Sequence, residues 1–182
     1  ERDVLETLFS ECRGSYWLHN KNWLTDESIC TWDGITCVEG EESIEVISLA
    51  RNKLKGRPPT EYLFALPNLK KLSLYDNPLQ SFDFEPIKNA EKLEELILDG
   101  TGILSLKGLE EAPSTLRKLS LNENVLVDYF PEEILALDNL RHVALSHNQL
   151  SGSLPAALAQ MTRLETLLVS SNNLKGDISD LR

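Results

Sequence analysis

The chain has 182 residues, of which 41% are hydrophobic and 26% charged, and its formal net charge is −11. This composition suits one soluble domain, and the sequence has no run of 18 apolar residues that would cross a membrane and no basic, apolar leader. The excess of acid excludes nonspecific nucleic-acid binding, which needs Lys and Arg to meet phosphate, and otherwise favours solubility.

Residues 1–43 do not share the pattern that fills the rest of the chain, and we expect them to form an amino-terminal cap. The apolar residues of segment 2–12 fall on one stripe of a helix, and Asp3 is a suitable helix start. They are Val4, Leu5, Leu8 and Phe9. The tryptophans that follow are Trp17, Trp23 and Trp32. Apolar mass of this kind predicts a cover for the open end of a repeat array.

The remaining segment, 44–182, repeats one phrase six times: an aliphatic ladder, a polar residue and one more aliphatic residue. The copies begin near residues 44, 69, 93, 116, 140 and 164. This spacing is the leucine-rich repeat, in which stacked coils bury one another's leucines because none can form a core alone. The predicted fold is therefore an α/β repeat solenoid, right-handed and curved, with a concave parallel β-sheet.

The polar residue of the phrase is Asn in five of the six copies. It follows the strand, where the chain turns and leaves backbone groups inside; a side-chain amide can donate to and accept from such groups. The predicted structural ladder is Asn52, Asn77, Asn124, Asn148 and Asn172. The third copy has Thr101, whose hydroxyl can do only part of this work.

Outward-facing residues of the six strands should form columns up the concave face, since parallel strands stack about 4.8 Å apart. Charges in the first two columns alternate and are expected to pair with one another: Lys70, Lys71, Glu94, Glu95, Arg117 and Lys118. The central column consists mostly of small residues, which leave the outer surface of the sheet open to a ligand. Two apolar residues that we expect to be exposed interrupt this column. The outer columns make a polar, acidic strip beside one Tyr, which would suit a basic peptide or a polar glycan.

The candidate ligand-binding residues are accordingly Tyr75, Asp76, Ile97, Asp99, Asn122, Glu123, His142, His147 and Leu168. Tyr75 is the best single contact, because exposed Tyr is favoured at recognition sites. The two His either sense mildly acidic pH or are ordinary surface residues. A solvated face that binds nothing is the alternative for the whole set.

Two phrases, Trp23-Leu24 and the run from Cys30 to Cys37 (CTWDGITC), resemble the cap of plant-type extracellular leucine-rich repeat proteins. That family includes receptor-kinase ectodomains and polygalacturonase-inhibiting proteins, and the same cap occurs in diatoms and related algae. The copies at 54–58, 150–155 and 174–178 carry its L-x-G-x-[IL]-P continuation in whole or part, whereas copies two and three lack it. The resemblance implies peptide hormones, glycans, cell-wall enzymes or a co-receptor as partners.

The resemblance also implies a disulfide between Cys30 and Cys37, which would staple the cap and indicate an oxidising compartment, outside the cell or at its surface. Cys12 is then left over, either as a buried free thiol or as a partner for another molecule. None of the 12 Asn begins an N-glycosylation site, so an intracellular location stays open as the alternative.

We interpret the sequence as a non-catalytic recognition module that binds a protein, peptide or glycan through its concave face. It would be a receptor ectodomain or a secreted binding protein; the alternatives are a structural or adhesion protein and an inhibitor of a secreted enzyme. No phosphate-binding Gly loop, H-E-x-x-H or G-x-S-x-G phrase is present, so no catalytic residue, cofactor or metal is expected.

The chain ends at Leu181-Arg182, and no distinct carboxy-terminal cap is visible in the sequence. An uncovered solenoid end exposes leucines. We therefore expect a truncated domain, or an end covered by a partner or a second copy, and a tendency to self-associate there.

Overall fold

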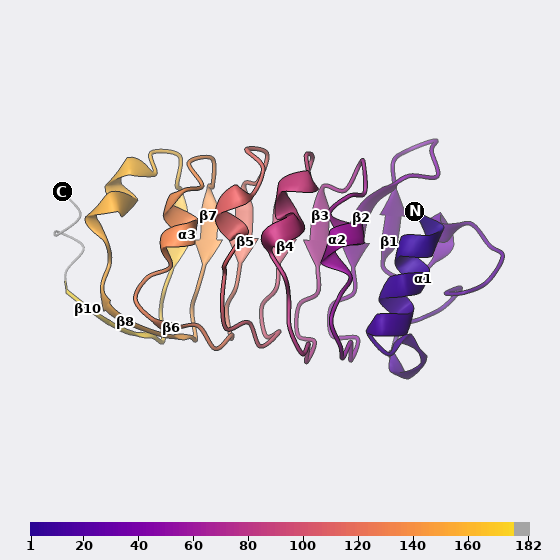
Figure 1. Ribbon diagram of the computed structural model, residues 1–182, viewed down its shortest axis with the longest axis horizontal. Coiled ribbons are helices and arrows are strands. Elements are labelled where there is room, and N and C mark those ends of the chain that lie inside the picture. Colours follow the sequence, from indigo (N-terminus) through magenta and orange to yellow (C-terminus); the bar gives the residue numbers. More distant parts are fainter. Residues whose placement is uncertain (177–182) are drawn as a thin grey trace.

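The computed structural model describes residues 1–176 as a curved stack of coils, with residue 1 and residue 176 at opposite ends (Figure 1). Each coil adds one strand to a seven-stranded sheet with the order β1-β2-β3-β4-β5-β7-β9. All neighbours pair in parallel except β1 and β2, which form an antiparallel pair where the cap meets the first coil. The predicted leucine-rich repeat solenoid is thereby confirmed. The strands are β1 (Ile35–Cys37), β2 (Ile44–Ser48), β3 (Lys71–Ser73), β4 (Glu95–Ile97), β5 (Lys118–Ser120), β7 (His142–Ala144) and β9 (Thr166–Leu168).

From β2 to β9 the register follows the repeat phrase without a slip, whereas the antiparallel pairing of β1 with β2 shifts between Thr36 and Cys37. On the parallel strands, the inward-facing aliphatic residue of one strand pairs with that of the next, as in Ile47 with Leu72 and Leu72 with Leu96. These side chains are completely buried. A shift by one residue would turn every apolar side chain to solvent, so burial fixes the register.

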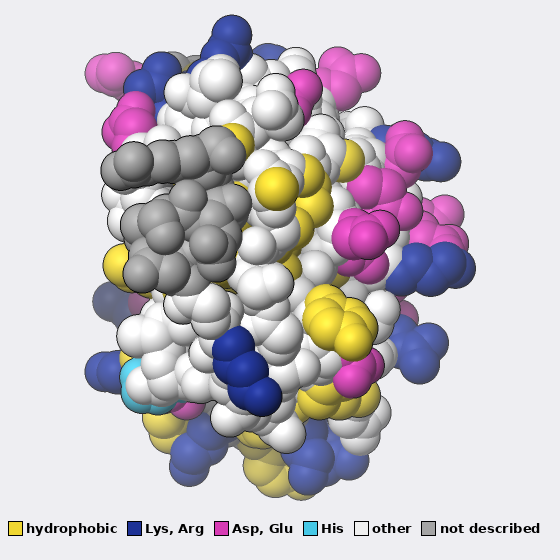
Figure 2. All heavy atoms as spheres, turned by 90° about the vertical axis from the view of Figure 1, so that its left-hand side faces the viewer, with side chains coloured by type: hydrophobic (Ala, Val, Ile, Leu, Met, Phe, Trp, Pro, Cys, Tyr) yellow, Lys and Arg dark blue, Asp and Glu magenta, His cyan; other side chains and the backbone are white. Residues whose placement is uncertain are grey.

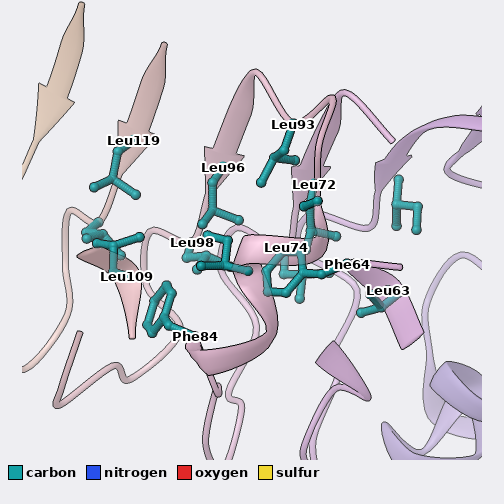
Figure 3. Close-up of a cluster of buried hydrophobic side chains, with 14 of the residues drawn as sticks. Leu63, Phe64, Leu72, Leu74, Phe84, Leu93, Leu96, Leu98, Leu109 and Leu119 are labelled. Atoms are coloured by element: carbon teal, nitrogen blue, oxygen red, sulfur yellow. The ribbon is translucent and has the colours of Figure 1, made fainter. Parts of the chain in front are cut away.

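Short helical turns form the opposite side of the coils, and buried side chains fill the space between them and the sheet (Figure 3). The turns are α2 (Thr60–Leu63), η3 (Glu85–Asn89), η4 (Leu109–Glu111), α3 (Glu132–Leu135) and η5 (Ala156–Gln160). Phe84 is 1% exposed, and its ring lies 4.9 Å from that of Phe82. Aromatic residues thus enter the core of the second coil, beside the leucines of the repeat phrase.

A second, smaller sheet runs along one edge of the later coils (Figure 1). It has the order β10-β8-β6 and consists of β6 (Val127–Asp128), β8 (Gln149–Ser153) and β10 (Asn173–Lys175). Within residues 1–176 it does not reach the first three coils. Coils two and three lack the L-x-G continuation, so the first coil, which has it, finds no neighbouring strand with which to pair.

The cap is a helix packed over a cluster of aromatic rings. It contains α1 (Arg2–Glu11), η1 (Gly14–Tyr16) and η2 (Ile29–Thr31), and Leu5 and Leu8 of α1 are fully buried. The ring of Trp23 lies 4.9 Å from that of Trp17 and 5.0 Å from that of Trp32. The predicted helix and apolar cover are present, while the division of the chain at residue 43 stays a prediction.

The three cysteines divide as the resemblance implied. Cys30 and Cys37 form a disulfide, whereas Cys12 is a free thiol with none of its surface exposed. Burial, together with the nearby Glu11 carboxylate, raises the pKa of Cys12 to about 12. The thiol therefore stays protonated and unreactive in the folded protein.

The carboxy-terminal end of the stack is seen face-on in Figure 2, where hydrophobic side chains show between polar ones. The apolar residues of this last coil are only partly buried: Leu164, Leu167, Val169 and Leu174. The prediction of an uncapped end concerns residues 177–182, which lie outside the described residues.

Asn side chains tie each coil to the one before it. Oδ1 of Asn77 accepts from the backbone N–H groups of Asn52 and Leu54 at 3.0 and 2.9 Å. Its Nδ2 donates to Leu49 O and Leu74 O, both at 2.8 Å. One amide thus satisfies buried backbone groups of two successive coils. Asn52, the first Asn of the ladder, connects to the cap in the same way: its Oδ1 accepts from the backbone N–H of His19, and its Nδ2 donates to the His19 carbonyl. The remaining connections between coils are made by Asn124, Asn148 and Asn172.

The third coil breaks this ladder. The hydroxyl of Thr101 donates to Leu98 O at 2.6 Å, within its own coil. The N–H of Leu79, at the position that Leu54 occupies one coil earlier, donates to Asn77 O at 2.8 Å, within its own turn. The side chain that crosses between coils elsewhere is therefore replaced here by two local hydrogen bonds.

Replacing Asn77 with Ala should lower the free energy of unfolding by about 3 kcal/mol, because several buried backbone groups lose their partner at once. Urea unfolding followed by circular dichroism measures this. The control is Asn89→Ala, an exposed Asn in η3, which should change the value by less than about 0.5 kcal/mol. Equal effects of the two substitutions would contradict the ladder.

Thr101→Asn should instead stabilise the protein by about 1 kcal/mol, since it restores the missing rung with a side chain of similar volume. The same substitution at the exposed Thr162 is the matched control and should be neutral. A loss of stability in Thr101→Asn relative to Thr162→Asn would show that the third coil cannot accept the rung.

Thiol counting should find one free thiol per chain in the unfolded, unreduced protein, and very slow reaction in the folded protein at pH 8. The first result follows from the Cys30–Cys37 bridge, and the second from the buried, protonated Cys12. Three thiols in the unfolded protein would contradict the bridge.

Candidate ligand-binding face

The concave sheet presents one column of outward side chains for each position along its strands. The columns are in register, because the strand pairing places Lys71 beside Glu95, Glu95 beside Lys118 and Lys118 beside His142. The predicted binding residues all come from these columns. Their exposure and partners therefore decide which of them are free to meet a ligand.

The central column is less open than the sequence predicts. Ser73 and Ser120 are only 5% and 8% exposed, and Ile97 is half-buried. Side chains on both neighbouring strands flank these inner positions. Leu168 lies on β9, the last strand of the sheet, and is 51% exposed. Of the two apolar residues expected to be exposed, Ile97 and Leu168, only Leu168 is.

The charged columns are largely neutralised by pairing between coils. Lys70 Nζ lies 2.7 Å from Glu45 Oε1, Lys71 Nζ lies 3.0 Å from Glu95 Oε2, and Arg141 Nη1 lies 2.6 Å from Glu165 Oε1. The expected pairing of charges among coils two to four is therefore correct for Lys71 and Glu95. It is wrong for Lys70, which pairs with Glu45 of the first coil. Arg117 donates to the backbone carbonyls of Ser114 and Leu116 instead.

Tyr75 is half-buried, and its polar and aromatic surfaces are already occupied. Arg51 Nη2 donates to the Tyr75 hydroxyl at 2.7 Å, and the guanidinium carbon lies 5.0 Å from the centre of the ring. Arg51 Nε also lies 3.4 Å from Asp76 Oδ2. The hydroxyl of Tyr75 and the nearby Asp76 raise the pKa of Arg51. The group is thus a preformed cluster at the edge of the face.

Asp99 is not the exposed acid that the sequence predicts, since only 6% of its surface is accessible. Its Oδ1 accepts from Ser120 Oγ at 2.7 Å, from the backbone N–H of Asn122 at 3.0 Å and from Asn122 Nδ2 at 2.5 Å. Burial follows from these bonds, which draw the carboxylate down against the next coil. In the predicted polar, acidic strip, the carboxylates of Asp76 and Glu123 are therefore exposed, whereas that of Asp99 is buried between them.

The hydrogen bonds of Asp99 begin a polar chain that the sequence analysis missed. Asn122 is half-buried, and its Oδ1 accepts from the backbone N–H of Ser146 at 2.8 Å. Ser170 Oγ then donates to Ser146 Oγ at 3.0 Å. These four residues occupy the same position in successive copies of the phrase, so the run of small polar residues in one column was the signal that would have found it.

The two His side chains have different surroundings. His142 is exposed, with Nδ1 3.2 Å from Thr166 Oγ1 and Nε2 3.9 Å from Glu165 Oε2. His147 lies beyond the carboxyl end of the same strand, is exposed, and has a left-handed backbone with φ of 57°. The structure places them at opposite ends of β7, so they do not form one pair.

A shallow hollow of about 270 Å³ lies where the cap meets the first coil. It is lined by His19, Asp33, Gly34, Ser48, Leu49, Ala50 and Asn52. No pattern in the sequence connects His19 with the repeat columns. The connection arises because the backbone of His19 bonds to Asn52 and so continues the face into the cap.

Among residues 1–176 there is no cluster of three or more His, Cys, Asp or Glu side chains suited to hold a metal ion. In the same part of the chain, every helix is too short or too polar to cross a bilayer.

Comparison with known proteins identifies the family of part of the repeat array. Residues 114–174 match the leucine rich repeat family, and no curated protein matches the sequence. The crystal structure of the Arabidopsis receptor kinase HAESA with the peptide hormone IDA and the co-receptor SERK1 is similar at 25% identity and a TM-score of 0.83. The match covers 96% of this chain and 30% of that one, so this chain spans under a third of its length.

Two further solved structures are similar to this chain. The ectodomain of the Arabidopsis receptor kinase GASSHO1/SCHENGEN3, in complex with CASPARIAN STRIP INTEGRITY FACTOR 2, is 26% identical, with a TM-score of 0.76 over 97% of this chain and 21% of that one. Pollen Receptor Kinase 3 is 21% identical and shares the fold, with a TM-score of 0.76 over 98% of this chain and 97% of that one. The chain is thus a leucine-rich repeat solenoid with a disulfide-closed cap, similar in structure to plant receptor-kinase ectodomains.

Proposed function

We propose that this chain is a non-catalytic recognition module whose concave face binds a peptide or protein partner. The observation that carries the proposal is the continuous seven-stranded sheet, which turns side chains from six successive coils to one side. The helical turns pack along the opposite side of the coils, so a long partner can lie across the strands. A surface of this shape suits an extended chain better than a small molecule, which needs a deep cavity.

The similar structures support this reading. HAESA was solved with the peptide hormone IDA and the co-receptor SERK1, and GASSHO1/SCHENGEN3 in complex with CASPARIAN STRIP INTEGRITY FACTOR 2. This chain matches only part of each, so transfer of peptide binding to it rests on the shared fold and on the open face described above. The candidate contacts that stay exposed are Asp76, Glu123, His142, His147 and Leu168, with Tyr75, Ile97 and Asn122 half-buried between them.

A glycan partner is less well supported than a peptide. Sugar rings stack on exposed aromatic faces, and Tyr75 is the one aromatic residue in the outward columns. Arg51 already lies over that ring. The charged pairs along the strands offer hydrogen-bonding groups to a peptide backbone and its side chains instead.

The disulfide supports a location outside the cell or at its surface, since such bridges persist in oxidising compartments. In that setting the domain would act as the sensing part of a receptor or as a secreted binding protein. Self-association through the carboxy-terminal end stays a prediction of the sequence.

The test is a binding screen of the chain against secreted peptides and extracellular proteins, repeated with one substitution on each side of the solenoid. Ala144→Glu puts a charged side chain in the central column of the sheet, and Ala157→Glu puts the same change in η5 on the opposite side. We expect Ala144→Glu to weaken binding at least about tenfold, a loss of about 1.4 kcal/mol, and Ala157→Glu to leave it unchanged. Binding lost only in Ala157→Glu would move the function to the convex side.

A further inference from the structure

The first coil has no coil before it, so its backbone lacks partners that the later coils have. In coils two to six, the carbonyl two residues after the strand accepts a hydrogen bond from a backbone N–H group of the preceding coil. Arg51 N donates to Tyr75 O at 2.8 Å in this way. The carbonyl at this position of the first coil belongs to Ala50, and the preceding element on that side is the cap.

The N–H group at the same position points the same way. That of Asn122 donates to Asp99 Oδ1 of the preceding coil at 3.0 Å, and the fifth coil repeats this bond. Alternation along the strand agrees for the first coil, because the N–H group of Ser48 donates to Gly34 O of the cap at 2.7 Å. Ala50 is the next residue that faces this side. It therefore turns both a donor and an acceptor towards the cap.

Neither of these two groups of Ala50 has a hydrogen-bond partner within residues 1–176. Both face the hollow of about 270 Å³ between the cap and the first coil, which Ala50 lines together with His19, Asp33 and Ser48. Backbone donors and acceptors are costly to remove from water without a partner. A group that enters this hollow must therefore satisfy both.

The edge of the first coil is already paired on either side of this hollow. Ser48 bonds to Gly34 of the cap, and Asn52 exchanges two hydrogen bonds with the backbone of His19. These two contacts lie four residues apart on the first coil, which is at most about 13 Å. A whole strand cannot run along the edge through both of them. A single side chain can enter from the concave face, past the exposed Ser48.

A primary carboxamide matches the groups that line the hollow. Its oxygen can accept from the Ala50 N–H, one of its N–H groups can donate to the Ala50 carbonyl, and the other needs a further acceptor. Asp33 supplies one, since its carboxylate lines the hollow and only its Oδ2 is engaged, by Lys21 N at 2.8 Å. An ammonium offers no acceptor to the Ala50 N–H. A carboxylate offers no donor to the carbonyl and is repelled by Asp33.

We propose that this hollow is a subsite for an Asn or Gln side chain of the bound peptide, at the cap end of the proposed face. The carboxamide donates to Ala50 O, accepts from Ala50 N and donates to Asp33, in the place that a preceding coil fills elsewhere. Asn77 makes the same kind of exchange inside the solenoid, where its amide bonds to backbone N–H and C=O groups. The inference rests on the proposed function and adds to it a specificity for one side-chain class.

The test uses the full chain labelled with ¹⁵N and three blocked probes: acetyl-Gly-Gln-Gly-N-methylamide and its Glu and Ala analogues. None of the probes has a charged terminus or a terminal primary amide, and the Ala probe offers backbone amides alone. The reporters are the backbone amide signals of Ala50 and Gly34. We expect saturable shifts with the Gln probe and at least about tenfold weaker binding of the other two probes.

Ala50→Leu should fill part of the hollow and weaken binding of the Gln probe at least about tenfold, as followed by the Gly34 signal. The fold should persist, because Tyr75 occupies the same position one coil later. Ser170→Leu makes a similar enlargement at this position of the sixth coil, where the residue is exposed, and should leave binding unchanged.

Asp33→Asn separates the contact with Asp33 from the volume of the hollow. An amide oxygen at position 33 can still accept from Lys21 N, so the fold should persist, while the acceptor for the probe is lost and binding falls about threefold. Asp26→Asn makes the same change at an exposed position of the cap and should have no effect. Equal binding of the Glu or Ala probe, full binding by Ala50→Leu or Asp33→Asn, or no saturable shift would each overturn the proposal.

Failure here is distinguishable from failure of the proposed function. A partner whose binding is lost in Ala144→Glu but kept in Ala50→Leu would leave concave-face recognition standing and remove the subsite. Conversely, Gln-probe shifts at Ala50 together with partner binding that survives Ala144→Glu would keep the subsite and overturn the proposed face.

Discussion

In this solenoid the chain turns after each strand, and at every junction of the described coils except that between the second and the third, a side chain of the next coil bonds to the backbone groups left inside. The Asn of the repeat phrase makes these bonds: Asn77 bonds to N–H groups of one coil and to carbonyls of two. Its amide reaches these groups only when the coils stack in one register. The apolar ladder supplies the free energy of stacking, and the Asn fixes how the coils are aligned. The cap follows the same rule, because the backbone of His19 stands in for a preceding coil.

This alignment also builds the outer face. Because residues at one position of the phrase lie side by side, a charge on one strand meets the charge of the next, as Lys71 meets Glu95. The same rule lets a short polar side chain reach the following backbone, as Asp99 and Asn122 do. The face is therefore a set of coil-to-coil interactions, and its chemistry depends on which side chains those interactions leave free.

The sequence predicted what depends on period and on single residues. The apolar spacing identified the coils and the inward positions such as Leu72 and Leu96, and the cap phrase indicated the disulfide of Cys30 and Cys37. It did not predict the exposure of outward residues, because alternation says which side a residue faces but not what its neighbours do. Asp99 was expected at the surface and is recessed, because Ser120 and Asn122 of the next coil draw it down. Tyr75 was expected to be free, and Arg51 of the previous coil covers its ring. The extent of the short second sheet was not predicted either, because each of its strands needs a neighbouring coil that also forms a strand there.

The central functional claim is that a partner lies on the concave sheet. Site-specific photocrosslinking tests it most directly, with a photoreactive amino acid placed at Leu168 on β9 or at Leu104, which is 71% exposed and lies outside the sheet strands. If the partner lies on the concave sheet, position 168 should crosslink to it and position 104 should not when the chain is exposed to extracellular peptides and proteins. A partner captured at position 104 and absent at position 168 would contradict it.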